Sequence, residues 1–173
     1  MSAITLGEFA EEAGWICRTT PEEARPARVA PLIGGLLSHP RLLDAAARAC
    51  PAAGYGRNTI HVDPDGLFSV IAAVWPPGIC TPIHDHKVWC AVGLYEGRMQ
   101  QRHYLPTDPA GGCDGCYTTE VVDMVPGDTC DLPVRDWNIH SMHNPYGETA
   151  ISIHVYGGNT HEVGPNLLKI YKA

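Results

Sequence analysis

The spacing of hydrophobic residues changes near residue 53, and this change divides the chain into two regions. In residues 4–50, apolar residues recur at helical spacing, most clearly in segments 6–17 and 39–50. Four prolines punctuate this region, and a proline inside a helix removes a backbone hydrogen bond. They are Pro21, Pro26, Pro31 and Pro40. The pattern predicts two to four short helices.

From residue 57 onward, short runs of β-branched and aromatic residues alternate with turn-forming residues. The runs at 58–62, 67–75 and 121–125 are each followed by a turn signal that contains Gly or Pro. Strands at this spacing are typical of an antiparallel sandwich or barrel, and a closed jelly roll leaves no strand edge exposed. We therefore predict a mainly β fold, a jelly-roll β-barrel with N-terminal helices, and a loop at residues 105–116.

Composition and charge limit the classes of protein that fit. The 173 residues are 45% hydrophobic, which suits a single domain with a helical cap at 1–52 and a β-barrel at 53–173. The formal charge of -7 argues against nucleic acid or an anionic membrane as a partner. No apolar run approaches the roughly 18 residues that span a bilayer, and the N-terminus does not resemble a secretory signal. We expect a cytoplasmic protein whose seven cysteines are free thiols.

A pair of histidines in the segment 81–90 is the first candidate for chemistry. Residues two apart on a β-strand point to the same face, so His84 and His86 would converge while Asp85 faces away. Two converging imidazoles are a candidate metal site. Ordinary surface histidines on a turn are the alternative.

A second candidate strand, residues 151–156, separates apolar and polar side chains onto opposite faces. Ile151, Ile153 and Val155 share one face. The other face carries Ser152, His154 and Tyr156. A core strand rarely gives a whole face to hydroxyl and imidazole groups, so this face is a candidate acid-base chain. A solvent-facing strand is the alternative.

These segments resemble two motifs of the cupin superfamily. The first motif is matched by Gly78, His84, His86, Cys90 and Gly97, with cysteine where the motif usually has glutamate. The second is matched by Gly127, Pro133, His140 and Asn144. Together with Tyr55 and Arg57 upstream and the polar face at 152–156 downstream, residues 55–160 are similar to the thiol dioxygenases of the cysteine dioxygenase family.

The resemblance implies an iron(II) site formed by His84, His86 and His140, with three open positions for substrate and dioxygen. His143 is the alternative third ligand. Cys90 replaces the carboxylate that would compete for the metal, and the strand would place it beside the ligands if it continued without a bulge. In animal relatives a cysteine at this place is joined by a thioether to the tyrosine that matches Tyr156, whereas many bacterial members carry glycine.

The remaining site residues are also implied by the resemblance. Arg57 would bind the substrate carboxylate through its planar guanidinium, and Tyr55 would line the same pocket. The hydroxyl of Tyr156 would point toward bound oxygen or the carboxylate. His154 and Ser152 would orient and polarise that hydroxyl.

The predicted function is oxidation of the thiol of L-cysteine to cysteine sulfinate by an iron(II) dioxygenase. The alternative substrate is 3-mercaptopropionate, because the sequence after Tyr156 resembles that bacterial group, although Arg57 matches cysteine-specific members. Another enzymatic class of cupin, or a cupin that only binds a ligand, stays open. The expected partners are a small thiol and dioxygen, with a monomer as the expected state. The role of Cys113 and Cys116, whose spacing suits zinc or redox chemistry, is left open.

Overall fold

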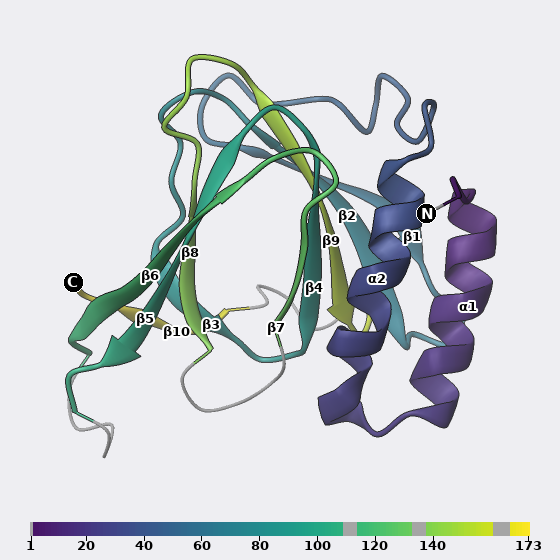
Figure 1. Ribbon diagram of the computed structural model, residues 1–173, viewed down its shortest axis with the longest axis horizontal. Coiled ribbons are helices and arrows are strands. Elements are labelled where there is room, and N and C mark those ends of the chain that lie inside the picture. The colour runs from purple at the N-terminus through teal and green to yellow at the C-terminus, as the bar shows by residue number, and fades with distance from the viewer. Residues whose placement is uncertain (1, 109–113, 133–137, 161–166) are drawn as a thin grey trace.

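The computed structural model describes residues 2–108, 114–132, 138–160 and 167–173 (Figure 1). The helical elements are α1 (Leu6–Thr19), the 3-10 helix η1 (Glu22–Ala24) and α2 (Arg25–Leu37). Ten strands follow: β1 (Gly56–Val62), β2 (Phe68–Trp75), β3 (Ile83–His86), β4 (Cys90–Glu96), β5 (Met99–Pro106), β6 (Cys116–Met124), β7 (Thr129–Leu132), β8 (Ile139–His143), β9 (Ala150–Gly157) and β10 (Leu167–Tyr171). Across these ranges, no helix is long and apolar enough to cross a membrane.

The N-terminal helices agree with the sequence prediction in one segment and not in the other. Thr5 caps α1, and its side chain and that of Glu8 form a reciprocal capping box. The predicted helix at 39–50 is wrong, because this segment contains turns and irregular backbone but no helix. The Asn58 side chain donates to the backbone oxygens of Ala47 and Ala49 at 2.9 and 2.8 Å. These tertiary hydrogen bonds use carbonyl groups near the end of the segment, and Pro51 follows directly.

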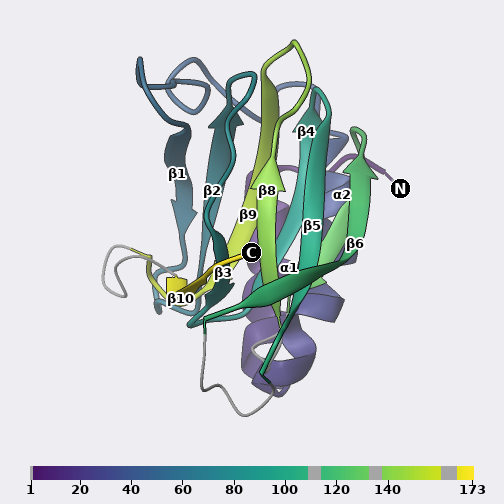
Figure 2. The same ribbon diagram turned by 90° about the vertical axis from the view of Figure 1, so that its left-hand side faces the viewer.

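The strands form two five-stranded antiparallel sheets that face each other (Figures 1 and 2). The first sheet has the order β1-β2-β9-β4-β7 and the second the order β10-β3-β8-β5-β6. This confirms the mainly β jelly roll with N-terminal helices. Among the strands that the structure describes, no ladder joins the two sheets, so the jelly roll is an open two-sheet arrangement instead of a closed barrel.

The helices cover the outer face of the first sheet (Figure 1). Apolar side chains of α1 and α2 pack there against those of β2 and β9, including Ile151, Ile153 and Val155. At Gly93 of β4, an added Cβ would lie 2.6 Å from the Ile33 side chain. The absence of a side chain at Gly93 therefore allows α2 to lie close against the sheet. With this face covered, the polar face of β9 points into the space between the sheets.

The loop between β5 and β6 differs from its predicted bounds, and two residues of the predicted motifs lie outside the described ranges. The predicted loop at 105–116 is shorter, because β5 extends through Pro106 and β6 begins at Cys116. Pro133 of the second motif and Cys113 of the cysteine pair lie outside the described residues, so the role of that pair stays open.

Candidate metal centre

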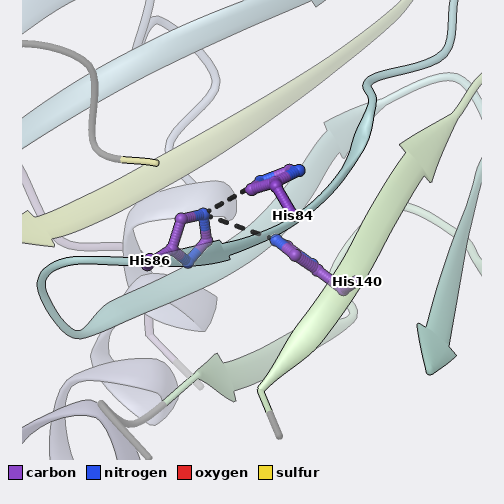
Figure 3. A group of neighbouring side chains, drawn as sticks. All are labelled: His84, His86 and His140. Carbon is purple, nitrogen blue, oxygen red and sulfur yellow. Dashed lines mark hydrogen bonds between the residues drawn. The ribbon is translucent and has the colours of Figure 1, made fainter. Parts of the chain in front are cut away.

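Three histidines from two neighbouring strands converge between the sheets (Figure 3). His84 and His86 lie on β3, and His140 lies on β8, directly opposite His84 in the strand register. Their side chains are buried, with exposed fractions of 5%, 7% and 1%. The Nε2 atom of His86 lies 3.1 Å from that of His84 and 3.4 Å from that of His140. The three Nε2 atoms therefore surround one point.

This arrangement fits a metal ion. Ligand nitrogens about 2.1 Å from one ion, at angles of roughly 90–110°, lie about 3.0–3.4 Å apart. The observed separations of 3.1 and 3.4 Å match this range. Without a metal, these three buried nitrogens would have only one another as hydrogen-bond partners. A buried polar atom that lacks a hydrogen-bond partner is energetically costly. Within the part of the chain that the structure describes, this is the only cluster of three metal-ligating side chains.

The Nδ1 atoms of the three rings have different surroundings. His84 Nδ1 lies 2.8 Å from the backbone oxygen of Pro82, so it carries a proton and leaves Nε2 free to bind a metal. His140 Nδ1 lies 3.1 Å from the side-chain amide of Gln101. His86 Nδ1 is buried and has no hydrogen-bond partner among the described residues. Two of the three candidate ligands therefore have an outer hydrogen-bonding partner.

Burial keeps the imidazoles neutral. It lowers the pKa of His84 and holds the pKa of His140 well below its ordinary value. For His86, burial and then the neighbouring His84 and Arg57 lower the pKa to about 3. Metal ions bind the neutral form of imidazole, so the cavity prepares the rings for coordination at neutral pH.

The neutral imidazoles predict that the metal-free protein loses stability as the pH falls from about 6.5 toward 3. In the unfolded chain a histidine takes up a proton near pH 6.5, whereas folded His86 does so only near 3. Between these values the unfolded state binds more protons, so the free energy of unfolding decreases as the pH decreases. Urea denaturation of chelator-treated protein at several pH values measures this slope. His86→Asn should have a shallower slope, and equal slopes would contradict a neutral His86.

The polar face of β9 forms a hydrogen-bonded chain beside the histidines. Ser152 Oγ lies 2.8 Å from His154 Nε2, and His154 Nδ1 lies 3.2 Å from the Tyr156 hydroxyl. All three side chains are buried. Burial holds the pKa of His154 well below its ordinary value, so its ring is neutral and has one donor and one acceptor nitrogen. The two faces of this strand are therefore as the sequence predicted.

Trp75 gives this chain a direction. Its indole N–H, which can only donate, lies 2.8 Å from Ser152 Oγ. The proton of Ser152 is then directed to His154 Nε2, the only other partner that the described contacts give it. His154 Nδ1–H donates to Tyr156, so the phenol O–H is available to donate to another acceptor. Burial raises the pKa of Tyr156 well above its ordinary value, so the phenol keeps that proton.

Cys90 lies beside Tyr156 on the neighbouring strand of the same sheet. The two residues are direct partners in the pairing of β4 with β9, and both are buried in one small cluster. The expectation that the strand of His84 and His86 continues to Cys90 is wrong, because the chain passes from the second sheet to the first between β3 and β4. Burial raises the pKa of Cys90 well above its ordinary value, so its thiol is neutral.

Arg57 and Tyr55 are at the same cavity. The Arg57 guanidinium lies 5.6 Å from the centre of the Tyr156 ring, and Tyr55 stacks on Trp75 with ring centres 4.5 Å apart. Arg57 is exposed overall, and part of its side chain lines the cavity. The cavity has a volume of about 40 Å³, enough for roughly three water-sized groups. The site is therefore suited to a small ligand.

The cavity wall includes residues that the sequence analysis did not assign to the site. They are Ile71, Ala73, Trp75, Thr81, Pro82 and Met142. No carboxylate is among the described residues that line it. The alternation of side chains along each strand could have identified which of these residues point inward. It could not have shown that they line the same cavity. His143 lies outside this group: it is three residues from His140 and points to the other face of β8.

Asp85 anchors the ligand strand from behind. Its carboxylate accepts a hydrogen bond from the Lys169 backbone N–H at 2.7 Å and one from the Tyr171 hydroxyl at 2.9 Å. Both donors lie on β10, which pairs with β3 through an irregular register. The carboxylate therefore takes the place of a backbone acceptor at this irregularity. As predicted, Asp85 faces away from the histidines, and it holds their strand in the sheet.

Comparison with known proteins supports the fold. No family model matches the chain. A Klebsiella pneumoniae protein with a double-stranded β-helix domain has a TM-score of 0.53 and 14% identity, covering 78% of this chain and 100% of its own. A Thermus thermophilus protein has a TM-score of 0.51 and 15% identity, covering 67% and 95%. The chain therefore has a double-stranded β-helix fold. A Silicibacter pomeroyi protein, described as a sugar phosphate isomerase from a cupin superfamily, has a TM-score of 0.46 and 22% identity, covering 61% and 60%.

Proposed function

We propose that this protein is an iron(II)-dependent thiol dioxygenase that converts L-cysteine to cysteine sulfinate. One observation carries the proposal. Three neutral imidazoles, the guanidinium of Arg57 and the phenol of Tyr156 line one small cavity, and no carboxylate is among its described lining residues. A site of this kind offers a metal to a thiol, a cation to a carboxylate and a proton donor to oxygen.

The ligand set explains why a thiol is the favoured substrate. His84, His86 and His140 would hold iron(II) through neutral nitrogens, and the ion would supply its full 2+ charge to a thiolate and to dioxygen. Neutral ligands favour an anionic substrate, because no protein charge offsets the metal. In the overall reaction one thiol and one dioxygen give one sulfinic acid, so both oxygen atoms end on sulfur and no other reductant is required.

The surrounding residues would bind and orient the substrate. Arg57 would pair with the carboxylate through charge-assisted hydrogen bonds. Tyr156 would donate its phenol proton into the cavity, because His154 already donates to its oxygen. The rigid chain from Trp75 through Ser152 holds this donor in one direction.

L-Cysteine is the first choice among carboxylate-bearing thiols because Arg57 matches the arginine of the cysteine-specific dioxygenases that the chain resembles, and 3-mercaptopropionate is the alternative. These substrates share the thiol and the carboxylate, and only cysteine has an amine. The described wall offers no acidic group to an ammonium, so the amine of cysteine would have to bind as a neutral metal ligand.

Metal analysis followed by oxygen uptake tests the proposed function. Purified protein is loaded anaerobically with iron(II), and oxygen consumption is measured with L-cysteine, 3-mercaptopropionate and cysteamine. We expect about one iron per chain and a sulfinate product in a 1:1 ratio to oxygen consumed. Iron binding without thiol-dependent oxygen uptake would favour another cupin enzyme or a ligand-binding protein.

A covalent link between Cys90 and Tyr156 is a further expected outcome. The two residues are cross-strand neighbours, so the sulfur can bond to a ring carbon of the tyrosine. The bond would remove one hydrogen from the thiol and one from the ring, and dioxygen would accept both with two electrons. After turnover, peptide mass spectrometry should find the two peptides joined and two hydrogens lighter. Cys90→Ser is the control, and unlinked peptides after prolonged turnover would contradict the prediction.

A further inference from the structure

Gln101 connects the candidate metal ligand His140 to the opposite sheet. Gln101 lies on β5 of the second sheet and is almost completely buried. In this structure its Nε2 atom is 3.1 Å from His140 Nδ1. Its Oε1 atom accepts a hydrogen bond at 3.0 Å from the thiol of Cys130, which lies on β7 of the first sheet. The side chain therefore bridges the space between the sheets directly behind a metal ligand.

The direction of this amide decides which nitrogen of His140 carries the proton. If the NH2 group faces His140, Nδ1 accepts, so the ring proton is on Nε2, the atom that points to the other two histidines. If the oxygen faces His140, Nδ1 donates and Nε2 has a free lone pair. Nitrogen and oxygen of an amide occupy nearly the same positions, so both orientations fit the same space. Only the second orientation is compatible with a metal bound at Nε2.

We propose that Gln101, which contacts Cys130, is a positioning residue that stabilises the metal-binding tautomer of His140 and thereby raises metal affinity. In the metal-loaded protein, Gln101 Oε1 accepts from His140 Nδ1–H, and its NH2 group donates to the sulfur of Cys130. The inference rests on the metal site within the proposed function, but not on the oxidation of thiols.

Cys130 suits this role because it binds the amide weakly in both orientations. A thiol is a weak donor and a weak acceptor, so it can face either end of the amide. Burial raises the pKa of Cys130 to about 12, which keeps the thiol neutral and avoids a buried charge behind the site. Metal binding therefore reverses one hydrogen bond at Cys130 and requires no movement of the strands.

The affinity for Co(II), measured by competition with a chelator, tests the proposal without any turnover. Gln101→Met keeps the length of the side chain and removes the acceptor, so the affinity should fall about 10- to 100-fold. Gln101→Glu, ionised beside the bound cation, presents only acceptors, so it should bind Co(II) at least as tightly as the wild type, while the Cys130 thiol donates to its second oxygen. Cys130→Ala should cause a smaller loss than Gln101→Met.

Two controls make the result specific. Gln100→Met changes the same residue type one position earlier on β5, where the side chain donates to Asp123 and not to a histidine, so its affinity should equal that of the wild type. His140→Ala should lose the metal. In the zinc-loaded protein, long-range proton-nitrogen NMR should show His140 protonated at Nδ1.

Three results would overturn the inference. The first is Gln101→Met binding Co(II) as tightly as Gln100→Met while His140→Ala does not bind. The second is a lower affinity of Gln101→Glu for Co(II) than that of the wild type. This measurement tests the inference even if Gln101→Met does not fold. The third is wild-type affinity in His140→Ala, which would overturn the metal site as well. A protein that follows the expected order of affinities but oxidises no thiol would contradict only the proposed function.

Discussion

His140→Ala is expected to abolish metal retention and thiol-dependent oxygen uptake together. His140 is one of three buried imidazoles whose Nε2 atoms surround one point, and the other two come from a single strand. Its loss leaves two neutral ligands, which hold a divalent ion much less strongly than three. Elemental analysis after anaerobic loading and gel filtration measures the retained metal.

His143→Ala is the matched control for this variant. It lies on the same strand, three residues away, but its side chain points to the opposite face. It should retain about one metal per chain and full activity. Loss of metal from the His143 variant, with retention in the His140 variant, would mean that the ligand assignment is wrong.

Arg57→Gln is expected to lower catalytic efficiency about 10- to 100-fold with L-cysteine. Its guanidinium lies at the cavity beside Tyr156, where it can pair with a carboxylate. Losing one charge-assisted interaction costs roughly 1.5–3 kcal/mol of transition-state binding. Steady-state oxygen uptake with the iron-loaded enzyme measures the loss. With cysteamine, which has no carboxylate, the loss should be smaller.

A surface arginine provides the control for the change of charge. Arg98 stacks on Tyr146 and does not line the cavity, so Arg98→Gln should leave oxygen uptake unchanged. An equal loss for Arg57→Gln on all thiols would show that Arg57 supports the fold and does not bind the carboxylate. A wild-type preference for 3-mercaptopropionate would favour the alternative substrate.

Local periodicity is what the sequence determined best. The alternation of a β-strand is a property of consecutive residues, so it placed His84 and His86 on one face and turned Asp85 away. The same argument put Ser152, His154 and Tyr156 opposite three apolar residues of β9. The jelly roll with N-terminal helices followed from the change in spacing near residue 53. None of these conclusions depends on which segments meet in space.

Contacts between distant segments were decided only by the tertiary structure. His140 was selected through its resemblance to a motif, because nothing local brings β8 beside β3. The segment at 39–50 has helical spacing but contains turns and irregular backbone, and the Asn58 side chain of β1 donates to two of its carbonyl groups. Cys90 lies beside Tyr156 because the chain crosses from the second sheet to the first between β3 and β4. The alternation of residues along a strand does not predict such a crossing.

The direction of the hydrogen bonds is the last property that required the structure. Trp75 determines the direction of the chain through Ser152, and Gln101 faces His140 from a neighbouring strand. A sequence lists donors and acceptors, but the partner of a buried polar group is set by the strand that packs beside it. The types of residue in the site could therefore be predicted from the sequence. Their hydrogen-bond partners, and with them the protonation of each ring, were determined by the packing of the two sheets.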